Sequence, residues 1–170
     1  MPGTPDPVVG SDPVTGIIAA SLSVFVIAIF VYIASERDVP AVVLTPIAAM
    51  SYGLFAAGLW AGVRVLFHHF ALDPLGEPTQ FAWLLLVAGG LLAMQAAIPF
   101  FLFARFGFVV PVAGFAVIST FLLFTFLRVG GESDPLALFG VGFAPVFIGG
   151  VLALALLEAG VRYVLTDRNR

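Results

Sequence analysis

Every charged residue of this chain lies outside five uncharged, mostly apolar stretches, and this spacing constrains the fold most strongly. The stretches are 22 to 27 residues long and cover residues 13–35, 39–63, 78–104, 106–127 and 135–157. A helix of about 20 residues spans the roughly 30 Å hydrocarbon core of a bilayer. A single charge at the centre of such a helix costs about 3 kcal/mol on insertion scales. We therefore expect an all-α integral membrane bundle of about five transmembrane helices.

The expected helices form a single membrane domain over residues 13–165, because the gaps between them are too short for a separate soluble domain. We place the spans at about 14–34, 41–63, 81–104, 108–127 and 136–157. Residues 1–12, rich in Pro and Gly, are expected to form a disordered leader, and residues 166–170 a polar tail. One alternative stays open, in which residues 81–127 are partly re-entrant and do not cross the membrane twice.

The arginines indicate the orientation of the bundle. With five spans, the side that holds the C-terminus receives five of them: Arg37, Arg105, Arg162, Arg168 and Arg170. The other side receives only Arg64 and Arg128. Basic residues are enriched on the cytoplasmic side of membrane proteins. We therefore expect a multi-pass protein of the cell membrane with its N-terminus outside and its C-terminus in the cytoplasm.

The composition excludes several classes of chemistry. The chain has no Cys and no Lys, so disulfides, thiolate metal sites and Schiff bases are impossible. A net charge of −3 without a basic run argues against nucleic-acid binding. No motif of a known catalytic set occurs in the sequence. We therefore expect no enzyme activity, no catalytic residues and no cofactor.

The second span carries the clearest packing pattern. Small residues recur at every fourth position, and a GxxxG pair lies beside them: Ala49, Gly53, Ala57 and Ala61, with Gly58 and Gly62. Small residues let helix backbones approach closely, and such packing drives helix association in lipid. This helix-packing face predicts a contact either with another helix of the same chain or with a helix of a second molecule.

Strongly polar side chains are rare inside the spans, and Gln95 is the most central one. A buried Gln usually forms a hydrogen bond to a neighbouring helix, and a contact with a transported substrate is the second interpretation.

Four prolines lie within the expected spans: Pro46, Pro99, Pro111 and Pro145. Proline can kink a helix, and broken helices form binding sites in transporters. If the prolines do form such a site, Gln95 lies near it. In either interpretation Gln95 is a possible buried polar contact.

A metal site is not expected, although His68 and His69 lie close to Asp73 and Glu77 in the sequence. Adjacent residues of a helix point about 100° apart, so the two imidazoles cannot easily share one ion.

Two pairs at the span ends have i,i+4 spacing, Arg64–His68 and Glu158–Arg162, and we expect them at the membrane interface. Trp60 and Trp83 are expected in an interfacial aromatic belt.

Taken together, these patterns predict a non-enzymatic membrane protein that acts through helix packing, as a subunit, an accessory protein or a homo-oligomer. Its expected partners are the lipid bilayer and other membrane helices, either of the same protein or of a partner subunit. The alternative function is a small transporter or channel lined by the Pro-containing spans two, four and five.

Overall fold

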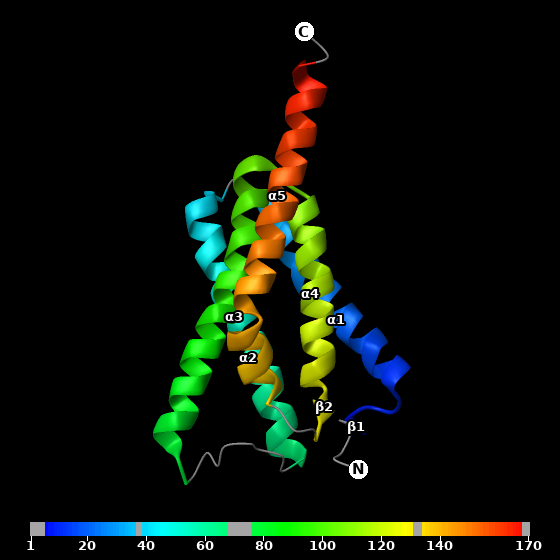
Figure 1. The fold of residues 1–170 in the computed structure, drawn as a ribbon, viewed down its shortest axis with the longest axis vertical. Coiled ribbons are helices and arrows are strands. Elements are labelled where there is room, and N and C mark those ends of the chain that lie inside the picture. Colours follow the sequence, from blue (N-terminus) through cyan, green and yellow to red (C-terminus); the bar gives the residue numbers. More distant parts are fainter. Residues whose placement is uncertain (1–5, 37–38, 68–75, 131–133, 168–170) are drawn as a thin grey trace.

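The computed structural model describes residues 6–36, 39–67, 76–130 and 134–167, and these residues form an elongated helical bundle (Figure 1). Its helices are α1 (Asp12–Glu36), α2 (Ala41–Phe67), α3 (Pro78–Phe106), α4 (Val110–Phe126), the π-helix η1 (Leu136–Gly142) and α5 (Ala144–Asp167). The predicted fold class, an all-α bundle, is confirmed. The number of membrane crossings and the orientation stay predictions.

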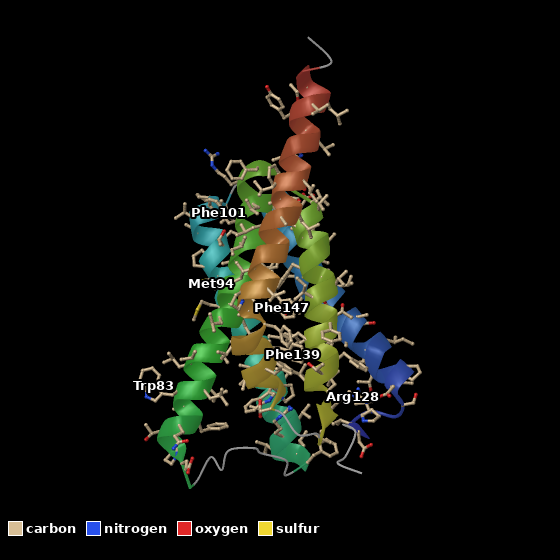
Figure 2. All side chains as sticks on the ribbon, viewed as in Figure 1. Trp83, Met94, Phe101, Arg128, Phe139 and Phe147 are labelled. Atoms are coloured by element: carbon tan, nitrogen blue, oxygen red, sulfur yellow. The ribbon has the colours of Figure 1, made fainter. Side chains whose placement is uncertain are left out.

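Within the described residues, α1, α2, α3 and α5 are long and apolar enough to cross a membrane, whereas the apolar helix α4 has 17 residues. Large apolar side chains cover the outside of the bundle. Trp83 projects from α3 to the outside of the bundle (Figure 2), Met94 is 50% exposed, and Leu54 on α2 is 70% exposed. A soluble monomer rarely exposes so much apolar surface. The structure therefore has the surface of a membrane protein.

Helices α3 and α4 form a hairpin through a tight turn at Gly107. This glycine has a φ of 67°, and its N–H bonds to the carbonyl of Phe103, which closes the C-terminus of α3. A left-handed residue at this position is usually Gly because it has no Cβ to clash. Both helices run along the length of the bundle (Figure 1). That residues 81–127 cross the membrane twice stays a prediction.

Part of the leader, residues 6 to 8, makes backbone contacts with the chain at the end of α4. Residues Asp6–Pro7 form strand β1 and pair antiparallel with Arg128–Val129, strand β2, directly after α4. The N–H of Val8 also donates to the carbonyl of Leu127, at 3.0 Å. The last carbonyls of a helix have no helical donor. The N–H of Val8 supplies one such donor, to the carbonyl of Leu127.

The structure also divides the fifth expected span, which we predicted as one helix over 136–157. The chain first forms the π-helix η1, in which the N–H of Phe143 bonds to the carbonyl of Leu138. The α-helix α5 then starts at Ala144 and continues to Asp167. Pro145 lies in the first turn of α5, where its missing N–H does not interrupt the helix. The proline therefore marks a junction between two kinds of helix.

Aromatic rings connect four helices in the core. The ring of Phe100 on α3 lies 5.0 Å from Phe30 on α1 and 5.7 Å from Phe115 on α4. Phe115 in turn contacts Tyr52 on α2, at 4.9 Å. The Phe100–Phe115 and Tyr52–Phe115 pairs meet edge to face, and such pairs add about 0.5–1.5 kcal/mol each beyond the burial of their area. In contrast, α5 packs at the periphery, and most of its side chains are exposed or half-buried.

Candidate functional site

The helix-packing face predicted on α2 lies partly against α3. A Cβ added to Gly53 would lie 2.9 Å from the carbonyl oxygen of Gly89 and 3.1 Å from the Cβ of Ala93. A Cβ atom in a protein usually lies about 3.4 Å or more from the nearest non-bonded heavy atom. Only glycine at position 53 therefore lets α2 lie this close to α3. Among the described elements, α2 and α3 share the most extensive contact. Gly53 therefore serves packing within the chain.

The GxxxG pair of the same face has a different environment. Gly58 and Gly62 are both exposed, and a Cβ added to either would have no described atom within 4 Å. Ala49 is buried, whereas Ala57 and Ala61 are half-buried at the edge between the two groups. The face is thus divided into an inner part that binds α3 and an outer part that the described fold leaves open.

A shallow apolar groove lies between α2 and α3 on this outer side. Its volume is about 580 Å³. Residues of both helices line it, including Gly58 and Ala61 of α2 and Gly89 and Gly90 of α3. Such short side chains leave the helix backbones close to the surface, which is the geometry that favours close packing of a further helix in lipid.

Gln95, the predicted polar contact, is buried in the bundle with 3% of its surface exposed. Its Nε2 atom has no hydrogen-bond partner among the described residues. Leaving a buried amide donor unpaired costs about 1–3 kcal/mol. The structure therefore buries the Gln95 side chain without giving its Nε2 a hydrogen bond to a described residue of a neighbouring helix.

Two other polar contacts hold α4 in place. The hydroxyl of Tyr52 on α2 donates to the Oγ of Ser119, at 2.8 Å. The hydroxyl of Ser23 on α1 donates to the carbonyl oxygen of Ala116, at 3.0 Å. Each such bond contributes about 1 kcal/mol. These bonds fix the register of α4 against α1 and α2.

Arg64 is a buried charge that the sequence prediction missed, with 4% of its surface exposed. Its Nε lies 3.9 Å from the Oδ2 of Asp134, and its Nη1 donates to the carbonyl of Phe126 at 3.4 Å. The guanidinium also lies 4.9 Å from the centre of the Trp60 ring. Trp60 is 1% exposed, so it belongs to this cluster and not to the interfacial belt that we expected.

Asp134 has a second role at the same end of the bundle. Its Oδ1 accepts hydrogen bonds from the backbone N–H groups of Leu136, at 2.7 Å, and Ala137, at 3.3 Å. One carboxylate therefore caps η1 and faces Arg64 of α2. The only sequence signal was that Arg64 ends a long uncharged stretch; its partner lies 70 positions further along the chain.

At the opposite end, Glu158 and Arg162 of α5 form the expected i,i+4 ion pair, at 2.6 Å. The carboxylate of Glu158 also accepts hydrogen bonds from the N–H groups of Val109, at 3.2 Å, and Val110, at 2.8 Å. Arg162 donates to the carbonyl of Phe106, at 3.0 Å. The pair thus caps the start of α4 and the end of α3, which the spacing alone did not predict.

The described residues contain no group of three or more His, Asp or Glu side chains that could hold a metal ion. His68, His69 and Asp73, named above as unlikely ligands, lie outside those residues.

Comparison of the chain with family models, with curated proteins and with solved structures finds no match.

Proposed function

We propose that this protein is a multi-pass membrane protein that acts through helix packing, as a subunit or accessory protein of a larger assembly or as a homo-oligomer. In this proposal it is not an enzyme, and it lies in the cell membrane. Its partners are lipids and the helices of a second membrane protein or a second copy.

The observation that carries the proposal is the open GxxxG pair beside the groove between α2 and α3. Gly53 of the same helix is already used inside the chain, but Gly58 and Gly62 face outward with free space around them. Packed helices in proteins lie about 8–10 Å apart, depending on the side chains at the contact. Two glycines one turn apart allow the short end of this range, which maximises van der Waals contact between helices in lipid.

The structure gives less support to the transporter alternative. That hypothesis relied on prolines that kink spans two, four and five. Pro111 lies in the first turn of α4, and Pro145 lies in the first turn of α5. Proline is tolerated at both places without a kink. Of these three spans, only α2 has a proline in its interior, Pro46. We therefore favour helix packing.

Replacing both outer glycines with isoleucine tests the proposal. Gly58→Ile and Gly62→Ile together should block close approach of a partner helix and leave the fold intact, because no described atom lies within 4 Å of the Cβ that either change adds. The matched control is Gly150→Ile on α5, an exposed glycine with similar free space. The mass of each protein, extracted from its native membrane with surrounding lipid, is the measurement.

The proposal expects the wild type and the Gly150 variant to keep their associated chains and the double variant to lose them. If all three proteins keep the same mass and composition, this interface is wrong.

A further inference from the structure

Two arginines and two phenylalanines form a row at the turn between α3 and α4. The guanidinium of Arg105 lies 5.8 Å from the centre of the Phe106 ring, and the ring of Phe106 lies 5.7 Å from that of Phe108. On the other side, the guanidinium of Arg162 from α5 lies 4.9 Å from the centre of the Phe108 ring. An aromatic ring attracts a cation at this distance. The two rings therefore hold one guanidinium at each end of the row.

The two arginines differ in their other contacts. Arg162 pairs with Glu158 and also donates to two backbone carbonyls of the turn. Arg105 is exposed, and among the described residues its side chain has neither an ion pair nor a hydrogen bond. The carboxylate of Glu158 already accepts from Arg162 and from the first N–H groups of α4. Within the described part of the turn, the positive charge of Arg105 is therefore left uncompensated.

The surface around Arg105 is apolar. Phe101 lies one helical turn before it on α3 and packs edge to face on Phe106, at 6.2 Å. The surfaces of these two rings are 38% and 52% exposed, and Val109 across the turn is 57% exposed. An anion dissolved in water would gain from the guanidinium but nothing from the rings. A molecule that joins an anionic group to a hydrocarbon chain gains from both.

The turn lies at one end of the elongated bundle (Figure 1), which is where the headgroups of a surrounding bilayer meet a protein that spans it. The planar fork of an arginine matches the oxygens of a phosphate with two parallel hydrogen bonds. In a zwitterionic lipid, the cation of the headgroup competes with the arginine for the same phosphate. An anionic phospholipid has no such cation and therefore fits the uncompensated charge of Arg105 better.

We propose that the α3–α4 turn binds one anionic phospholipid. The guanidinium of Arg105 donates to its phosphate oxygens, and an acyl chain lies along the rings of Phe106 and Phe101. The inference rests on the membrane placement in the proposed function, but it does not depend on association through α2.

Replacing Arg105 with glutamine tests the site. The variant removes the charge, and the side chain has no hydrogen bond within the described fold to lose. The matched control is Arg128→Gln, which makes the same change in net charge at the opposite end of the bundle, where Arg128 pairs with Asp12. Each protein, purified in detergent, is titrated with phosphatidylglycerol and separately with phosphatidylcholine. Native mass spectrometry counts the bound lipids and the chains in each particle.

One arginine near an anionic lipid contributes about fivefold to binding. The wild type and Arg128→Gln should therefore bind the first phosphatidylglycerol about fivefold more tightly than phosphatidylcholine, and Arg105→Gln should lose this preference. A wild type without the preference, or an Arg105→Gln variant that keeps it, overturns the proposal. Displacement of bound phosphatidylglycerol by an equal concentration of inorganic phosphate also overturns it, because the site would then be one for simple anions. The same spectra record the number of chains, so failure of helix association and failure of lipid binding are told apart.

Discussion

Replacing Gly53 with alanine should weaken the packing of α2 on α3, and the structure sets the size of the effect. The new Cβ would lie 2.9 Å from the Gly89 carbonyl oxygen, whereas ordinary contacts begin at 3.4 Å, so the helices must separate by at least about 0.5 Å. Overpacking of this kind costs about 1–3 kcal/mol. Alanine also favours a helix over glycine by about 1 kcal/mol, which partly offsets the loss.

Gly58→Ala measures the gain in helix propensity alone. Gly58 lies on the same helix, and its new Cβ would meet no described atom within 4 Å. The free energy of unfolding of Gly53→Ala should therefore be lower than that of Gly58→Ala by about 1–3 kcal/mol. Reversible unfolding in mixed micelles by added SDS, under conditions where both proteins are monomers, measures the difference. Tryptophan fluorescence reports the transition, because Trp60 is buried and becomes exposed on unfolding, whereas Trp83 is exposed already. Equal stability of the two variants would refute the close approach at Gly53.

Two further substitutions probe the ends of the bundle. Asp134→Asn keeps an oxygen for the first N–H groups of η1 but removes the charge that faces Arg64, so it should lower the free energy of unfolding by about 1.5–3 kcal/mol. Adding Arg64→Met should recover most of that loss in thermal unfolding, and additive losses would contradict the pairing. Glu158→Ala removes the acceptor for the first N–H groups of α4, worth about 0.5–2 kcal/mol. Hydrogen exchange of the backbone N–H groups in the first turn of α4 should therefore be faster in this variant, and unchanged in the control variant Gly150→Ile. An unchanged rate in Glu158→Ala would exclude the cap.

The overall class of fold could be predicted from the sequence because it follows from a local property, the length of uncharged apolar stretches. Each expected span contains or overlaps an apolar helix of the structure. The stripe of small residues on α2 could be found in the same way. Its division could not, because the point where α3 crosses α2 decides that Gly53 is packed and Gly58 is open.

The remaining differences arise from contacts between distant parts of the chain. Arg64 is buried because Asp134 and the end of α4 surround it, and neither is near it in the sequence. Asp6–Pro7 form a strand because the chain after α4 offers them a strand to pair with. Pro145 did signal an irregularity in the fifth span, but a proline alone does not tell a kink from the start of a new helix.

The most direct test of the central claim is the mass and composition of the wild-type protein, extracted from its native membrane together with the surrounding lipid. The account predicts that the protein part of the particle has a mass above the 17.9 kDa of one chain. The additional mass is either further copies of this chain or another membrane protein in fixed stoichiometry. A single chain with lipid alone would contradict the proposal that this bundle acts through helix packing.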